Sequence, residues 1–124
     1  MQATAGQGVG RYINDLAGQG LDGQVDPVTG QFNLVYATGW NASYENWFNE
    51  NWLMNFTYSK VDVDNTSGQP GTSYDAANYM AASLWWVPII RMSFGIEYIR
   101  GQRTNLDGQD AEANRLSGLF QYNF

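Results

Sequence analysis

The last ten residues place the strongest constraint on what this chain folds into. One parity of this stretch holds Leu116, Gly118, Phe120, Tyr122 and Phe124, and the other holds Arg115, Ser117, Leu119, Gln121 and Asn123. A period of two predicts a strand, because successive side chains of a strand point to opposite faces. An exposed aromatic edge strand recruits other chains in water, whereas in an outer-membrane barrel the aromatic face meets lipid. The final strand therefore favours a membrane β-barrel.

The same period of two recurs upstream. Strands are predicted at 31–45, 52–59, 78–87, 90–101 and 115–124, with one shorter extended stretch at 9–16. Long polar connections are predicted near 17–30, 60–77 and 102–114, and tight turns at 47–52 and 87–90. Long external loops alternate with short periplasmic turns in outer-membrane barrels.

The predicted fold class is therefore all-β: an antiparallel transmembrane β-barrel in a single domain, residues 1–124. About six strands are too few to close a bacterial barrel, so we expect the C-terminal strands of a larger one. The first residues show no signal peptide. This predicts a mature chain or a piece of a longer one.

Composition narrows the function. Charged residues make up 15% of the chain, against about 25% in a typical soluble domain. The net charge of −6 argues against a nucleic-acid partner. The chain has no His and no Cys, which removes the commonest general base, the commonest metal ligand and thiolate chemistry. We therefore expect no enzymatic activity, no cofactor and no metal site.

Strand parity predicts two sets of functional residues. A charge on the lipid face of a barrel costs about 2–4 kcal/mol at the midplane, so charged side chains are expected to point inward. The predicted pore-lining residues are Arg91, Glu97, Arg103 and Arg115. The alternative is a network of ion pairs in the wall that plays no part in selectivity. The predicted aromatics at the lipid interface are Trp40, Trp47, Trp52, Trp86, Tyr98, Tyr122 and Phe124.

Several short motifs lie between residues 84 and 124. They are Trp86-Val87-Pro88, the string Gly-Ile-Glu-Tyr-Ile-Arg-Gly-Gln-Arg over 95–103, Asp107-Gly108, Asn114-Arg115-Leu116 and the closing Gln121-Tyr122-Asn123-Phe124. Together they resemble the C-terminal strands of the DcaP-type trimeric porins of Gram-negative bacteria. The resemblance implies a water-filled barrel, a homotrimer in the outer membrane and passive diffusion of small, often anionic, solutes. It also implies that the barrel-assembly machinery recognises the terminal Phe124.

The sequence thus predicts an outer-membrane porin with membrane lipid as its main partner. Two alternatives stay open. One is a soluble or surface-exposed β-sandwich that binds carbohydrate through its Trp and Asn side chains. The other is a structural membrane β segment without channel activity.

Overall fold

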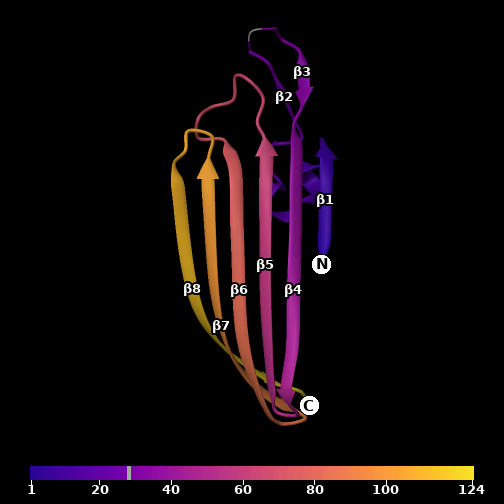
Figure 1. Ribbon diagram of the computed structural model, residues 1–124, viewed down its shortest axis with the longest axis vertical. Coiled ribbons are helices and arrows are strands. Elements are labelled where there is room, and N and C mark those ends of the chain that lie inside the picture. Colours follow the sequence, from indigo (N-terminus) through magenta and orange to yellow (C-terminus); the bar gives the residue numbers. More distant parts are fainter. Residues whose placement is uncertain (28) are drawn as a thin grey trace.

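The computed structural model describes residues 1–27 and 29–124 as one six-stranded antiparallel sheet and one two-stranded ribbon (Figure 1). The sheet has the order β1-β4-β5-β6-β7-β8. Its strands are β1 (Gln2–Gln7), β4 (Tyr36–Asn49), β5 (Trp52–Asp64), β6 (Tyr74–Ile89), β7 (Met92–Asn105) and β8 (Asp110–Tyr122). The ribbon pairs β2 (Gly23–Val25) with β3 (Phe32–Leu34). The predicted all-β fold class, with an antiparallel sheet of about six strands, is confirmed.

The two ends of the sheet differ. The β2–β3 ribbon projects beyond one end, which we call the upper end; the tight connections β4–β5 and β6–β7 lie at the other, lower end (Figure 1). Residues 50–51 and 90–91 make these two connections. The strand predicted to end at residue 87 continues through Pro88 to Ile89. The ladder shifts register between Trp86 and Ile89, and this irregularity accommodates Pro88, which has no backbone N–H to donate.

The predicted extended stretch at 9–16 is wrong. These residues instead contain two short 3₁₀ helices, η1 (Gly10–Tyr12) and η2 (Asn14–Leu16), and the first strand lies earlier, in β1. The physical reason is the spacing of Ile13 and Leu16. Residues three apart fall on one side of a helical turn, and both of these side chains are buried.

The buried core lies where the η1–η2 segment meets the upper part of the sheet. Its members are Ile13, Leu16, Leu21, Val35, Ala37, Val61, Val63 and Tyr74. Gly39 on β4 permits this close approach, since a Cβ at that position would lie 3.2 Å from Cγ2 of Ile13. The coil behind β1 and β4 in Figure 1 is this segment.

The long connections are shorter than predicted. The loop expected at 60–77 spans 65–73, and the loop expected at 102–114 is a turn at 106–109. In both places the alternation of the strand continues, but charged residues occupy one of its two faces. In β5, for example, Val61 and Val63 join the core, while Asp62 and Asp64 lie on the opposite face. The loop expected at 17–30 contains β2, and position 28 within it lies outside the described residues.

Among residues 1–27 and 29–124, the sheet has two open edges and does not close into a barrel. β8 pairs with β7 only, and β1 covers β4 only from Tyr36 to Asn41. Within the described part of the chain, residues 42–49 of β4 therefore have a strand on one side alone, that of β5.

Candidate functional site

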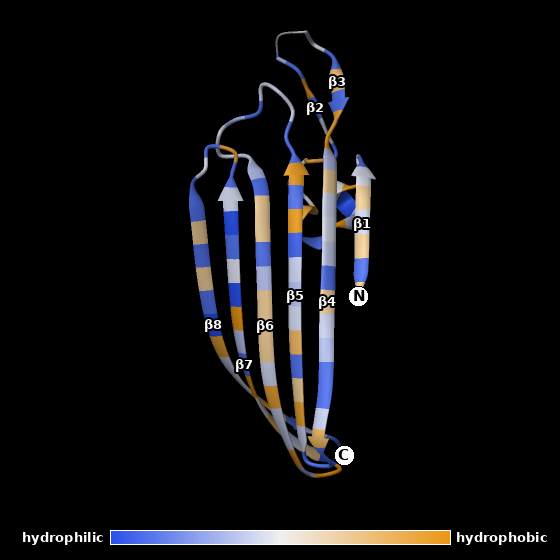
Figure 2. Ribbon diagram, in the orientation of Figure 1, coloured by the Kyte–Doolittle hydropathy of each residue, from blue (hydrophilic) through white to orange (hydrophobic). Residues whose placement is uncertain are grey.

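Strand register defines two faces of the sheet. Cross-strand partners lie on the same face, and from β4 to β8, outside the bulges, even-numbered residues pair with even-numbered residues. We call the face that carries them the even face and the opposite one the odd face. Stripes of hydrophobic and hydrophilic residues along β5, β7 and β8 display this alternation in Figure 2.

A row of aromatic rings crosses the lower part of the even face. Trp52, Trp86, Phe94 and Phe120 are in register across four strands. Their ring centroids are 6.4, 5.6 and 5.2 Å apart in that order, which is the range of favourable aromatic pairs. The rows above add Met54, Phe56, Leu84, Ile96, Tyr98 and Leu116. From β5 to β8 the lower part of this face is thus continuously apolar.

The upper part of the even face is charged. Nη2 of Arg100 lies 2.7 Å from Oε2 of Glu112, and Nζ of Lys60 lies 2.7 Å from Oδ1 of Asp62. The boundary falls at Tyr98, whose hydroxyl donates a hydrogen bond of 2.6 Å to a side-chain amide oxygen on β8. A ring on the apolar side with its hydroxyl on the polar side is the arrangement that favours Tyr at a membrane interface.

Most of the predicted interface aromatics share the even face. These are Trp40, Trp52, Trp86, Tyr98 and Tyr122. Trp47 does not, because it pairs with Leu53 on the odd face. Trp47 was grouped with the other aromatics because it lies close to the β4–β5 turn in the sequence. Its odd parity places it on the face of the sheet opposite to theirs. Phe124 follows the end of β8, with its ring 5.7 Å from that of Tyr122.

The predicted pore-lining charges are not brought together as one cluster. Glu97 and Arg115 lie on the odd face, with Nη2 of Arg115 3.6 Å from Oε2 of Glu97. Arg103 shares that face at the upper end. Arg91 lies in the connection between β6 and β7, so its predicted position within a strand is wrong, and its pore-lining role stays a prediction. The Glu97–Arg115 contact fits the alternative of a wall ion pair as well as it fits a pore lining.

Arg103 is held at the top of the sheet by three contacts. Its Nε donates to Oδ1 of Asn105 at 3.0 Å, its Nη2 donates to the carbonyl oxygen of Thr72 at 3.3 Å, and its guanidinium carbon lies 5.0 Å from the centre of the Tyr74 ring. The Thr72 contact ties β7 to the 65–73 loop and the Tyr74 contact ties it to β6, so the side chain acts as a structural link there.

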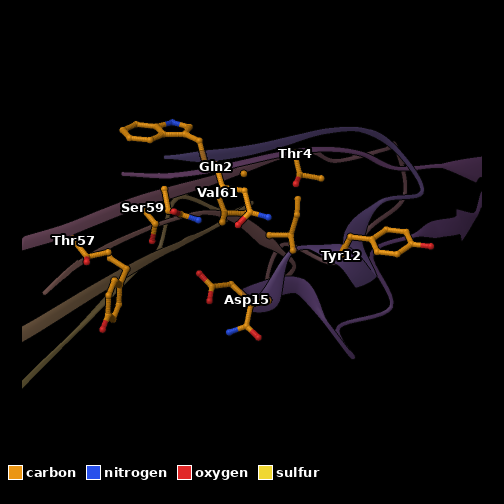
Figure 3. Close-up of a pocket in the computed structure, with 13 residues that line it drawn as sticks. Gln2, Thr4, Tyr12, Asp15, Thr57, Ser59 and Val61 are labelled. Carbon is orange, nitrogen blue, oxygen red and sulfur yellow. The ribbon is translucent and has the colours of Figure 1, made fainter. Parts of the chain in front are cut away.

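A cavity of about 470 Å³ opens on the odd face beneath the η1–η2 segment. Thr57 and Ser59 of β5 and Tyr79 of β6 form its wall, and Asp15 of η2 faces them from the segment (Figure 3). The volume is within the range of small-molecule sites, about 300–1,000 Å³. Asp15 is its one charged lining side chain among the described residues.

Sequence reasoning missed this cavity because it treated 9–16 as a strand. The signal was present in Ile13 and Leu16, whose spacing of three indicates a helical turn with one buried side. Asp15 does not share that side, and it is exposed. A helical interpretation would have predicted that the segment packs on the sheet, but it would not have placed Asp15 at the cavity.

Within residues 1–27 and 29–124, no group of three or more acidic, His or Cys side chains is placed to hold a metal ion. No helix in the same part of the chain is both long and apolar enough to cross a membrane. Comparison with protein-family models, with curated proteins and with solved structures gives no match. The resemblance to DcaP-type porins therefore stays a prediction.

Proposed function

We propose that this chain forms part of the wall of an outer-membrane porin through which small hydrophilic solutes diffuse passively. The observation that carries the proposal is the uncovered apolar area of the even face. Ile96 on β7 and Phe120 on the edge strand β8 are 51% and 62% exposed, and the rings beside them are exposed as well. Contiguous exposed apolar area of this kind marks a surface that meets lipid or another protein.

The height of this area supports lipid as its environment. Along β7 the apolar positions of the even face run from Met92 to Tyr98, about 20 Å at 3.3 Å per residue. Outer-membrane barrels carry an outward apolar band about 25 Å tall with aromatic girdles at its borders. Charged pairs begin one row above Tyr98, with Arg100.

The odd face carries an apolar row at its lower end, formed by Trp47, Leu53, Trp85 and Leu119, and polar groups above it that suit contact with water. Its hydroxyls pair with each other, as do Ser43 Oγ and Thr57 Oγ1 at 3.0 Å, and it carries the Glu97–Arg115 ion pair. The η1–η2 segment folds over the upper part of this face, where it would narrow a channel.

The open edges support a larger barrel. Unpaired backbone groups are not tolerated in the hydrocarbon region. The outer edge of β8 and residues 42–49 of β4 therefore need further strands, from a longer chain or from other chains. Trimer formation, outer-membrane location and recognition of Phe124 by the assembly machinery belong to this proposal.

The carbohydrate-binding alternative requires two sheets packed face to face. The described residues form one six-stranded layer, and the β2–β3 ribbon extends beyond its end without covering a face (Figure 1). The alternative of a structural segment differs from our proposal in conductance alone.

Two measurements test the proposal. The folded chain should require detergent or lipid to remain dispersed, and after insertion into a planar bilayer it should give discrete conductance steps. A monomeric chain that stays soluble without detergent would contradict membrane insertion. Inserted, folded protein without conductance steps would contradict channel function for this chain by itself and favour the structural segment.

A further inference from the structure

The cavity beneath η1–η2 has an unbalanced charge. Asp15 is exposed, and none of the ion pairs among the described residues includes it. The other side chains that face the cavity from the sheet are neutral. A carboxylate that faces a cavity without an ion-pair partner attracts cations.

The arginines of the odd face and of the η1–η2 segment are engaged elsewhere. Arg103 contacts the 65–73 loop, Arg115 contacts Glu97, and Nη2 of Arg11 lies 3.6 Å from Oδ2 of Asp22. None of the three lines the cavity. The local field in the cavity is therefore set by the acid.

The wall opposite Asp15 presents groups that both donate and accept hydrogen bonds. Ser59 and Tyr79 contribute hydroxyls, and Asn41, the cross-strand partner of Ser59, contributes an amide. Hydroxyl groups of a solute match such partners in either direction. The geometry combines one anionic group with a wall that suits hydroxyls, in a space the size of a small molecule.

We infer that this cavity binds small hydroxylated organic cations, such as a protonated amino sugar, with Asp15 as the charge partner. The inference rests on the proposed porin function, since it names the class of solute that the wall favours. It runs opposite to the anionic solutes that the family resemblance implies.

Titration of the isotope-labelled, full-length chain in detergent micelles, followed by NMR, tests this inference. The probes are glucosamine, its neutral counterpart N-acetylglucosamine and the anionic glucuronate, at a mildly acidic pH where the glucosamine amine is protonated. Glucosamine should shift the resonances of Asp15, Ser59 and Tyr79 saturably. The other two probes should bind about 10-fold or more weakly, the difference that one charge-assisted hydrogen bond makes.

Substitutions locate the effect. Asp15→Asn should weaken glucosamine binding about 10-fold and leave N-acetylglucosamine unchanged. Asp64→Asn is the matched control, because it removes the same charge from the opposite face of the sheet and should change nothing. Asn41→Lys places a cation in the wall that offsets Asp15 and should abolish the preference for glucosamine, which keeps the test decisive if Asp15→Asn fails to fold.

Equal or tighter binding of glucuronate by the unsubstituted chain would overturn the inference. So would an unchanged glucosamine affinity in folded Asp15→Asn, or the absence of saturable shifts. Conductance measured on the same sample separates the two proposals. Glucosamine binding without conductance supports the cavity but not the channel, and conductance without a charge preference supports the channel but not the cavity.

Discussion

The upper part of the odd face and the lower part of the even face are built from the same strands, but only the first is covered by the chain. On the odd face, Ile13 and Leu16 bury Val61 and Val63 of β5. On the even face, the rings of Trp52, Trp86 and their row remain exposed. The difference teaches that the same alternation of side chains along the strands supplies both a core that the chain itself covers and an apolar face that it leaves uncovered. The small core stabilises one end, and the apolar face depends on its surroundings.

The largest expected effect is on the covered side. Leu16 is 1% exposed, so Leu16→Ala should lower the free energy of unfolding by about 2–5 kcal/mol through lost burial and a cavity. Leu106→Ala in the exposed β7–β8 turn is the control, with an expected change within about 0.5 kcal/mol. Urea unfolding of the micelle-bound chain measures both. Equal effects would mean that the η1–η2 segment does not pack on the sheet.

A charge on the uncovered side should be nearly as damaging. Ile96→Arg places a guanidinium in the middle of the apolar area and should cost about 2–4 kcal/mol in lipid. Ser117→Arg lies at nearly the same height on the odd face, beside Glu97, and should cost far less. Folding yields in lipid vesicles compare the two variants. If both fold equally well, the even face does not meet hydrocarbon.

Two glycines of β7 sharpen the description of the odd face. A Cβ at Gly95 would lie 2.8 Å from Cε3 of Trp85, whereas nothing lies within 4 Å of a Cβ at Gly101. Gly95→Ala should therefore cost about 1–3 kcal/mol by overpacking. Gly101→Ala should be neutral or stabilise by about 0.4–1 kcal/mol through the unfolded chain. Thermal unfolding of the two variants checks this, and a stabilised Gly95→Ala would refute the Trp85 contact.

The smallest effect belongs to the Glu97–Arg115 pair. A double-mutant cycle with Glu97→Gln and Arg115→Gln should give a coupling of about 0.2–1 kcal/mol, because the Arg115 side chain is 67% exposed. The coupling should shrink as salt is raised. A coupling that is both larger and insensitive to salt would show that this part of the odd face is shielded from water.

The sequence predicted the sheet well where apolar residues alternate with small ones, as from Trp52 to Tyr58 and from Phe94 to Tyr98. It failed where charges took the place of the apolar residues. At Lys60–Asp64 the charged positions continue the even face above the apolar area, and only the buried Val61 and Val63 preserve the signal. At Asp110–Asn114 polar residues likewise occupy the even face, and only alanines lie on the odd face.

The candidate cavity was out of reach for a different reason. Its residues come from β1, η1, η2, β4, β5 and β6, and their meeting depends on the chain folding back across Gly39. No local pattern in β4 or β5 encodes that contact. The strand register was also missing from the prediction of the interface aromatics. Trp47 was grouped with its neighbours in sequence, and its pairing with Leu53 shows that it lies on the odd face.

The central claim is that the even face meets lipid while the odd face meets water. The chain has no cysteine, so single Cys substitutions along β7 can report each position without background. In lipid vesicles a water-soluble maleimide should label Ser93→Cys and Glu97→Cys but not Phe94→Cys and Ile96→Cys. Such a period of two is the result that our account predicts. Equal labelling at all four positions would contradict it.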